Sequence, residues 1–390
     1  MGFVSAVHND GGVVAAAAAS GASAQEAADE IARKLLGLDL AALLVFVSSD
    51  YDAAEFAREI AARFGSAPVV GCTTAGEMTP EGWTDGAVVA IGFKRRDFAM
   101  VARPILDLAH FRVEDGRVIA AELRAEMARL APAAEMEHAF AMLLIDGMCR
   151  REEAVISALH RALDDVPIVG GSAGDALRFE RTFVIHGGKV YGDAAVLMLF
   201  KTRLPIRIFK CDHFEPTPVK MVVTEADSER RIVRELNAEP AAQEYARVSG
   251  LADSSLDPFS FASHPVLVGV GGEYYARSIQ RVNPDGSLSF FCAIDEGLVF
   301  TAARRRDPFA CVREVFHRTE AEIGEVEMYI GFECVLRRLD AEREQAAHEM
   351  SQLYRANRVV GFNTYGEQYQ AMHVNQTFTG VAIGRRREVA

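Results

Sequence analysis

The side chains with the clearest potential for chemistry lie in a short glycine-containing pattern that occurs three times. Each copy has a β-branched pair, a glycine, a small hydroxyl or amide residue, a second glycine and a carboxylate. The copies span residues 68–77 (PVVGCTTAGE), 167–175 (PIVGGSAGD) and 358–367 (RVVGFNTYGE). Their candidate ligand-binding residues are Thr73, Glu77, Ser172, Asp175, Asn363 and Glu367. Backbone N–H groups and side-chain oxygens of such turns bind polar ligands, whereas the same carboxylates can instead hold their own loops.

Catalysis is a second use for carboxylates and thiols in these positions. Carboxylates such as Asp146, Glu77 and Glu367 would suit a hydrolase or lyase if two of them approached a bound substrate. Cys72 lies in the first copy, but a nucleophilic thiol needs a base or a positive field, and no histidine is close in sequence. The turns contain neither a Walker A lysine nor a GxGxxG fingerprint. We therefore expect a protein that is not an enzyme, with no catalytic residues, and keep the carboxylate hydrolase or lyase as an alternative.

Arg277 is the candidate for binding a carboxylate. It lies between Tyr275 and Ile279 in a strand-like stretch, so these three side chains point to one face. A guanidinium pairs bidentately with a carboxylate, which belongs either to a ligand or to the nearby Glu273. An internal salt bridge with Glu273 is therefore the alternative to ligand binding.

The three turns belong to a repeated unit of strand, helix, strand, glycine turn, loop and strand. A tight turn accounts for the glycines, because glycine takes positive φ at little cost and lets other groups approach the backbone. Buried-looking strands precede the turns at residues 43–47, 141–145 and 327–332, and further strands follow at 86–93, 194–200 and 379–384. The interval before each turn accommodates one helix and its connections, as a βαβ crossover requires.

A change in composition divides the chain. Three prolines fall between residues 200 and 221, where no convincing periodicity is present, so we place a boundary near Glu215. This gives an N-terminal domain of residues 1–215 with two copies of the unit, and a C-terminal domain of residues 216–390 with one clear copy plus antiparallel strands. The predicted fold class is α/β, with two mixed-sheet α/β domains built from the repeated strand-helix-strand-Gly turn-strand unit.

The C-terminal half has its own local signals. Antiparallel strands are expected at residues 266–270, 274–282, 287–294 and 298–303, and residues 283–286 (NPDG) have the composition of a hairpin turn. Asp307 and Pro308 read as the N-cap and first residue of a helix. Further helical segments are expected over residues 228–248 and 339–357.

The bulk composition excludes several classes of protein. The chain has 390 residues and is 50% hydrophobic, which is enough for two domains with cores. A net charge of −13 argues against nucleic-acid binding, which needs a basic surface. No apolar run approaches the roughly 20 residues of a membrane-spanning helix. The six cysteines form no CxxC motif or zinc-type cluster. We therefore expect a cytoplasmic protein with reduced thiols that binds neither membranes nor nucleic acid.

Six motifs in order make the chain resemble a full-length FIST protein, comprising the FIST N and FIST C sensory domains. The matching segments are residues 70–77, 146–147 with 152–153, 170–175, 274–279, 295–297 and 361–368. Together they span nearly the whole chain. The resemblance implies small-ligand sensing in signal transduction, often in proteins that also carry kinase, cyclase or chemotaxis modules.

The stand-alone arrangement resembles one branch of this family more closely. The chain shows no output module, and residues 369–380 (YQAMHVNQTFTG) also resemble the haem-binding, nitric-oxide-sensing branch (NosP). That resemblance implies haem b as the cofactor, nitric oxide as the ligand and a separate histidine kinase or cyclic-di-GMP enzyme as the partner. A FIST sensor of an amino acid or other small carboxylate metabolite is the alternative. A homodimer is a further expectation.

A haem would need an axial ligand in a mostly apolar cavity with cations near its propionates. Our first choice of ligand to the iron is His373, because it follows the third glycine turn within a strand-like stretch. His264 and His186 are the other candidates. Arg277 would then pair with a propionate, and Tyr365 in the third turn completes the expected cofactor-binding set. A structural histidine bonded to a backbone carbonyl is the alternative for His373.

Overall fold

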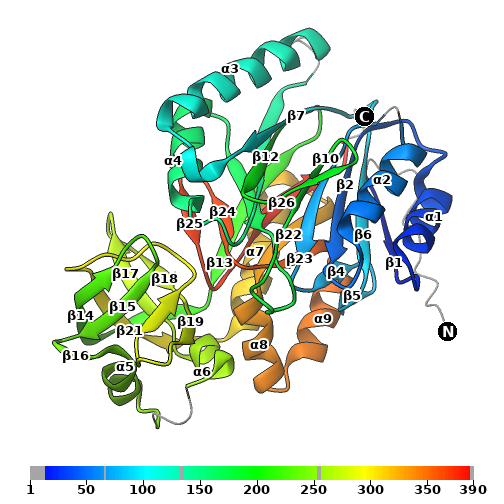
Figure 1. Cartoon of the computed structure of the whole chain (residues 1–390). Helices are drawn as coiled ribbons and strands as arrows, with labels where there is room; N and C mark the ends of the chain where they lie inside the picture. Colours follow the sequence, from blue (N-terminus) through cyan, green and yellow to red (C-terminus); the bar gives the residue numbers. More distant parts are fainter. Residues whose placement is uncertain (1–13, 66, 132–135, 253–255, 387–390) are drawn as a thin grey trace.

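The computed structural model describes residues 14–65, 67–131, 136–252 and 256–386, which form mixed α/β sheets with helices packed on their outer faces (Figure 1). Three six-stranded sheets have the same plan, and one larger antiparallel sheet stands beside them. The predicted fold class, a mixed-sheet α/β protein with a repeated unit, is therefore confirmed.

The first unit supplies most of one sheet. Its elements are β1 (Val14–Ala19), α1 (Ala24–Leu35), β2 (Leu40–Ser48), α2 (Ala53–Arg63), β3 (Val69–Thr74), β4 (Glu77–Thr79), β5 (Gly82–Thr84) and β6 (Val88–Lys94). Strands β2 and β3 are parallel, and β6 runs antiparallel between β2 and β1. Every residue of β2 is buried, as expected for a strand covered on both faces. The Asp52 side chain accepts hydrogen bonds from the first amides of α2 and so fixes where this helix begins.

The second unit repeats this plan. Its elements are β7 (Phe98–Leu106), α3 (Val113–Leu130), β8 (His138–Ile145), α4 (Glu152–Leu163), β9 (Ile168–Ser172), β10 (Val184–His186), β11 (Lys189–Tyr191) and β12 (Ala194–Thr202). Strands β8 and β9 are parallel, and β12 lies antiparallel between β8 and β7.

The third unit is interrupted. It begins with β13 (Ile206–Asp212) and continues with α7 (Pro308–Ile323), β22 (Val326–Cys334), α8 (Val335–Arg343), α9 (Ala347–Ala356), β23 (Val359–Thr364), β24 (Glu367–Tyr369), β25 (Met372–Val374) and β26 (Thr377–Gly384). Asp307 and Pro308 cap α7 as predicted. The helix expected over residues 339–357 is instead the pair α8 and α9, because Gln345 adopts a left-handed φ of 57° between them.

A further sheet, which we call the inserted sheet, occupies the gap between β13 and α7. Its elements are β14 (Phe214–Asp227), β15 (Ile232–Leu236), β16 (Glu239–Pro240), α5 (Ala241–Ser249), α6 (Pro258–Ser263), β17 (Val266–Val270), β18 (Glu273–Arg277), β19 (Ile279–Val282), β20 (Leu288–Phe290) and β21 (Val299–Arg305). All its strand pairs are antiparallel, and the turn at 283–286 joins β19 to β20 as predicted.

Two local predictions fail in this sheet. Helix was expected from residue 228, but β15 and β16 occupy that stretch and only α5 is helical. Left-handed backbone at Arg231 and Asn237 interrupts any helix, while Val233 is fully buried in the sheet. The expected strand over residues 274–282 divides into β18 and β19 at Ser278. The proposed boundary at Glu215 falls inside β14, and the division into residues 1–215 and 216–390 stays a prediction.

The two-strand hairpin of each unit pairs with the sheet of a different unit. Hairpin β4–β5 adds to β23, hairpin β10–β11 adds to β3, and hairpin β24–β25 adds to β9. The pairing is cyclic: the hairpin of the first unit joins the sheet of the third, that of the third joins the second, and that of the second joins the first. The three units are therefore joined by backbone hydrogen bonds as well as by packing.

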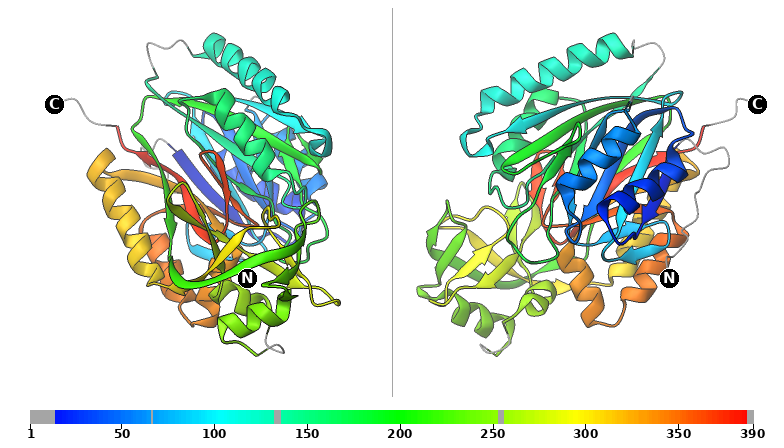
Figure 2. Two further views of the ribbon diagram at one scale, coloured as in Figure 1. Left: turned by 90° about the vertical axis from the view of Figure 1, so that its left-hand side faces the viewer. Right: turned by 45° about the vertical axis from the view of Figure 1, so that its right-hand side comes forward.

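The inner faces of the three sheets meet in one core. Phe46 of the first unit packs against Phe362 and Phe332 of the third, with ring centroids 4.6 and 6.2 Å apart. Helices cover the outer faces, and Figure 2 (right) shows α1 and α2 lying over the sheet of the first unit. The inserted sheet projects to one side of this three-unit body (Figures 1 and 2).

The cysteines differ from the expectation in one respect. Cys211 at the end of β13 and Cys311 in α7 form a disulfide, so the prediction of six reduced thiols is wrong for this pair. This pairing was not recognisable from the sequence, because the inserted sheet separates the two cysteines by 100 residues. Cys72, Cys149, Cys292 and Cys334 are free.

Candidate functional site

The three glycine turns meet at the centre of the molecule and hydrogen-bond to one another. The linking bonds are Ala75 N–H to Asn363 O (3.0 Å), Ser172 N–H to Gly366 O (2.8 Å) and Gly174 N–H to Thr73 O (3.0 Å). A Cβ atom added to Gly174 would lie 2.7 Å from the Cβ of Ala75, so the turns are in close contact. We call this arrangement the turn ring.

The carboxylates of the first and third turns hold their own units together. Glu77 accepts a bond from the Ala87 amide (3.0 Å), and Glu367 accepts bonds from the amide and hydroxyl of Thr377 (3.2 and 2.6 Å). In each case a threonine three residues upstream also donates its hydroxyl. Burial raises the pKa of Glu77 to about 7 and that of Glu367 to about 8. Both side chains are fully buried and hydrogen-bonded within the protein. This arrangement corresponds to the alternative in which the carboxylates hold their own loops and do not bind a ligand.

Asp175 connects the second turn to the third unit. Its carboxylate accepts bonds from the amides of Phe179 (2.9 Å), Glu180 (2.7 Å) and Arg181 (3.0 Å), and also from the Tyr365 hydroxyl. These bonds shape residues 176–183, which we call the second-turn loop. Tyr365, expected in a cofactor site, therefore fixes the base of this loop.

Thr73, Ser172 and Asn363 also make bonds within the protein. Thr73 accepts a bond at Oγ1 from the Phe183 amide (3.0 Å) and so ties the first turn to the second-turn loop. The Ser172 hydroxyl accepts from Gln368 (3.1 Å), and the Asn363 amide oxygen accepts from Arg338 (3.3 Å). Of the six predicted turn residues, only Thr73 and Asp175 line a cavity described below.

Asp146, the other carboxylate considered for catalysis, is also engaged. It accepts a bond from the Thr182 hydroxyl and from the amides of Met148 (2.9 Å) and Asp193 (2.6 Å). Burial raises the pKa of Asp146 above its ordinary value. The hydrogen bonds of Asp146, Glu77 and Glu367 described above each stay within one unit, so these acids are arranged as structural supports.

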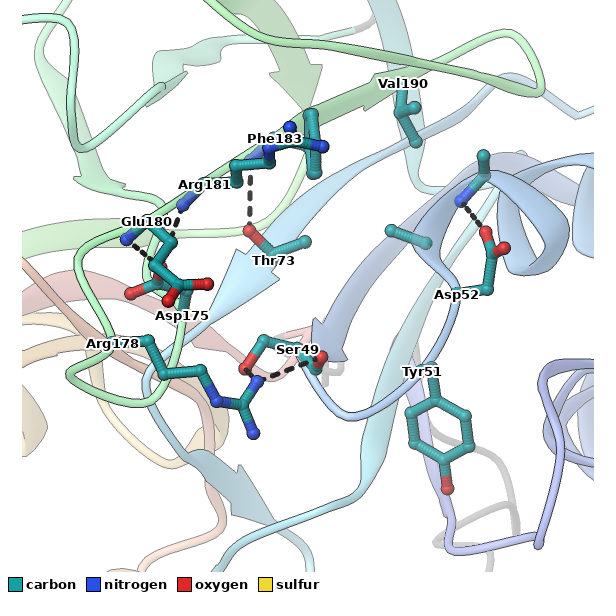
Figure 3. A pocket seen from close by; sticks show the side chains of 12 residues that line it. Ser49, Tyr51, Asp52, Thr73, Asp175, Arg178, Glu180, Arg181, Phe183 and Val190 are labelled. Atoms are coloured by element: carbon teal, nitrogen blue, oxygen red, sulfur yellow. Dashed lines mark hydrogen bonds between the residues drawn. The ribbon is translucent and has the colours of Figure 1, made fainter.

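A cavity of about 340 Å³ opens beside the turn ring (Figure 3). It lies at the carboxyl ends of the parallel strands β2 and β3 and is closed on one side by the second-turn loop. Thr73 and Asp175 lie at its edge, and Tyr51, Phe183 and Val190 supply apolar walls. Ligands of α/β proteins commonly bind outside the carboxyl ends of parallel strands. We call this hollow the strand-end cavity.

Two arginines of the second-turn loop give the strand-end cavity its cationic side. Arg178 contacts Asp50 through Nη2 (2.6 Å) and donates through Nη1 to the Ser49 carbonyl and hydroxyl (3.3 and 3.2 Å), as Figure 3 shows for Ser49. Arg181 also lines the cavity and has no ion-pair partner among the residues the structure describes. Glu180 provides an acid on the same loop. The cavity thus offers cations for a carboxylate, an acid for an ammonium group and an apolar wall for a side chain.

The sequence reasoning missed both arginines. Nothing in the spacing of residues 176–183 indicates that this loop folds back over the ends of β2 and β3. The only signal was the cluster of charged residues directly after Asp175.

Arg277 and His373 lie elsewhere, at the contact between the inserted sheet and hairpin β24–β25. An isolated bridge pairs Ala276 with Asn375 at this contact. Arg277 is 9% exposed, and its Nε and Nη1 atoms have no hydrogen-bond partner among the described residues. No ion pair joins it to the exposed Glu273 within the part of the chain that is described. The salt bridge considered as an alternative for Arg277 is therefore absent from this structure.

His373 is buried and neutral. Gln368 contacts its Nδ1 atom (3.1 Å), and desolvation lowers the pKa of His373 to about 4. Its Nε2 atom faces Gly366 so closely that a Cβ atom there would lie 2.6 Å away. A porphyrin on this nitrogen would have to displace the third turn. The residues around His373 therefore do not fit a haem in this conformation.

The other two histidine candidates, His264 and His186, lie on other elements. His264 ends α6 with Nδ1 at 3.2 Å from the Ser260 carbonyl, and His186 lies on β10 beside β3. Burial lowers the pKa of His186. Across the described residues, no group of three or more His, Cys, Asp or Glu side chains could hold a metal ion.

The chain matches two family descriptions along most of its length. The FIST N domain matches residues 41–239, and the FIST C domain matches residues 241–370. A protein of Methanocaldococcus jannaschii, named "Uncharacterized protein MJ1623", is 22% identical over 354 residues, covering 80% of this chain and 67% of that protein. No helix in the described residues is long and apolar enough to cross a membrane. FIST domains are sensory domains that bind small ligands in signalling proteins. The chain belongs to the FIST family.

Proposed function

We propose that the protein is a signalling sensor that binds a small carboxylate, such as an amino acid, in the strand-end cavity. The observation that carries this proposal is the pair Arg178 and Arg181, which the second-turn loop places beside the carboxyl ends of β2 and β3. A ligand carboxylate would pair with these guanidinium groups, and an α-ammonium group would approach Glu180.

The second-turn loop also connects the strand-end cavity to other parts of the structure, so ligand binding there could change the conformation of those parts. The loop leads from the turn ring to β10, and β10 pairs with β3 of the first unit. A ligand that competes with Asp50 for Arg178 would change how the loop is tethered to the first unit. The exposed surface around this loop would then differ between the free and bound states.

Titration calorimetry and thermal shift with the twenty amino acids and a set of small dicarboxylates test the proposal. A ligand at 100 times its dissociation constant adds about 2.7 kcal/mol to stability. Arg178→Ala should weaken binding of any hit by about tenfold or more, because a charge-assisted bond to the carboxylate is lost.

Arg304→Ala is the matched control. Arg304 also forms a surface ion pair, with Glu215 (2.5 Å), but lies in the inserted sheet away from the cavity. If both variants bind the hit as the unaltered protein does, the strand-end cavity is not the site. If no compound of the panel binds, the carboxylate proposal fails.

The resemblance to the nitric-oxide-sensing branch supports a second proposal, a haem-based sensor that signals to a histidine kinase or a cyclic-di-GMP enzyme. It requires the third turn to move away from His373. An absorbance spectrum of the protein supplied with haem would then show a Soret band that shifts with nitric oxide and is lost in His373→Ala. A spectrum without such a band would reject it.

A further inference from the structure

We propose a second binding site, for a small phosphorylated molecule with at least two negative charges, in a hollow between the second unit and the inserted sheet. The hollow has a volume of about 250 Å³. We call it the arginine hollow, because Arg150, Arg230, Arg231 and Arg281 all line it. It is separate from the strand-end cavity, and the proposal does not depend on the function assigned there.

The four arginines come from three segments distant in sequence. Arg150 precedes α4 in the second unit, Arg230 and Arg231 form the turn between β14 and β15, and Arg281 lies on β19. No acidic residue is among those that line the hollow. The fold therefore gathers positive charge at one place on a chain whose net charge is −13.

Three of these arginines are available to a ligand. Arg150, Arg230 and Arg281 are exposed, and their side chains have no ion-pair partner in the described part of the chain. Arg234 of β15, by contrast, is paired with Glu225 (3.2 Å). Guanidinium groups gathered around one hollow repel each other, and a bound anion relieves that repulsion.

Arg231 holds the geometry of the hollow. Its side chain is nearly buried and bonds to Glu152 and Glu153 (both 2.6 Å) at the start of α4, and to the Phe291 carbonyl. These bonds join the inserted sheet to the second unit directly beneath the hollow. Its backbone adopts a left-handed φ of 56°, and the neighbouring Arg230 lines the same hollow.

The chemistry of the lining selects phosphate. Guanidinium groups bind phosphate oxygens through paired hydrogen bonds, and a phosphate dianion or pyrophosphate offers enough oxygens for several arginines at once. Phe179 and Phe291, whose ring centroids lie 5.6 Å apart, form an apolar wall of the same hollow. The volume suits a small metabolite with a phosphorylated end and an apolar or ring-shaped remainder.

The site also has a connection to the rest of the molecule. Phe179 belongs to the second-turn loop and follows Arg178 directly in sequence. Its ring packs against Tyr365 (5.0 Å), which bonds to Asp175 at the base of that loop. A ligand in the arginine hollow would therefore contact the loop that closes the strand-end cavity.

Titration calorimetry of the whole chain with inorganic pyrophosphate at low and moderate salt tests the site. We expect saturable binding of pyrophosphate to the unaltered protein. Arg230→Gln and Arg281→Gln should each weaken this binding about tenfold, because each removes one charge-assisted contact. The double variant should not bind pyrophosphate. Arg234→Gln is the matched control, because it removes a charge from β15 of the same inserted sheet, outside the hollow. Circular dichroism establishes that each variant is folded.

Three outcomes would overturn the proposal. Undetectable binding of pyrophosphate rejects the site. Equal weakening by Arg234→Gln and Arg281→Gln shows general charge attraction instead. Citrate bound as tightly as pyrophosphate rejects phosphate as the ligand class. Arg230 and Arg281 line only the arginine hollow, whereas Arg178 and Arg181 line only the strand-end cavity, so loss of pyrophosphate binding in Arg230→Gln and Arg281→Gln is distinguishable from loss of carboxylate binding in Arg178→Ala.

Discussion

At the scale of single residues, the buried carboxyl groups of Glu77 and Glu367 make the stability of the protein depend on pH. Burial raises the pKa of Glu77 to about 7 and of Glu367 to about 8, above the ordinary value of 4.5. Between about pH 4.5 and 8 the folded protein keeps protons on these groups that the unfolded chain releases. Their contribution to stability is therefore full below about pH 4.5 and is lost as the pH rises through 7 and 8.

Glu367→Gln should flatten this decline. The amide keeps one oxygen for the Thr377 bonds and cannot ionise, so the free energy of unfolding should fall less steeply between pH 5 and pH 8 than in the unaltered protein. The difference between the two proteins should reach an order of a few kcal/mol. Urea unfolding followed by circular dichroism at several pH values measures it. Parallel curves for both proteins would contradict the assignment.

Tyr365 is the second residue with a measurable role. Its hydroxyl accepts a bond from the Leu177 amide (2.8 Å) and donates one to the buried Asp175. Tyr365→Phe should lower the free energy of unfolding by about 1–3 kcal/mol, because buried polar groups lose their partner. It should also speed tryptic cleavage at Arg178 and Arg181. Tyr191→Phe, whose hydroxyl makes no hydrogen bond to the residues that the structure describes, should change stability by less than about 0.5 kcal/mol.

The sequence predicted these residues only in part. The turns themselves are recognisable because glycine, hydroxyl and carboxylate recur at fixed spacing. Arg178 and Arg181 were not recognisable, because their role depends on how a loop folds over strands about 100 residues earlier in the chain. The environment of His373 was equally hidden, since Gly366 covers Nε2 only once the third turn is folded.

At the scale of elements, the first glycine of each turn is explained by the close approach of another group to the backbone, which we expected as one of two reasons for the glycines. Gly71, Gly170 and Gly361 lie within strands β3, β9 and β23, where each faces the parallel neighbour strand. A Cβ atom there would lie 1.8–1.9 Å from a carbonyl oxygen of that neighbour. Close approach of two strands, rather than a tight turn, explains this part of the repeat.

Gly170→Ala should therefore prevent normal folding. The added methyl group would meet the Leu143 carbonyl at 1.8 Å, and backbone cannot move away without breaking the parallel pair. We expect a loss of stability above about 3 kcal/mol, or insoluble protein. Gly37→Ala, where no atom lies within 4 Å, is the control and should leave the melting temperature nearly unchanged. Equal melting temperatures would contradict this account of the glycine.

Elements with strong local signals were predicted well. Helix α7 follows from the Asp307 cap and its apolar spacing, and the hairpin β19–β20 follows from residues 283–286. The region after residue 228 was not predictable in this way. Its polar composition permits a helix, and only pairing of β15 with β14 and β20 makes it a strand.

At the scale of the whole molecule, the exchange of hairpins makes the three units interdependent. The pairings join β4 to β23, β10 to β3 and β24 to β9, across long intervals of sequence. A repeat in the sequence reveals that the units are alike, but not that they exchange strands. The exchange places the second-turn loop of one unit over the strand ends of another, and this placement creates the strand-end cavity.

The same arrangement gives the sensor proposal its mechanism. The second-turn loop contacts the first unit through Arg178, the third unit through Tyr365 and the inserted sheet through the Phe179–Phe291 pair. A ligand that changes the conformation of this loop would therefore alter its contacts with the first unit, the third unit and the inserted sheet. Arg178→Ala should raise the exchange rate of amides in the loop even without a ligand, because a tether to Ser49 and Asp50 is lost.

Hydrogen exchange measured by mass spectrometry, with and without a carboxylate that the panel identifies, tests the central claim most directly. We predict slower exchange on binding in residues 176–183 and at the start of α2, and no such change in Arg178→Ala. Protection confined to the neighbourhood of His373, or no protection in the second-turn loop, would contradict the assignment of the strand-end cavity as the sensing site.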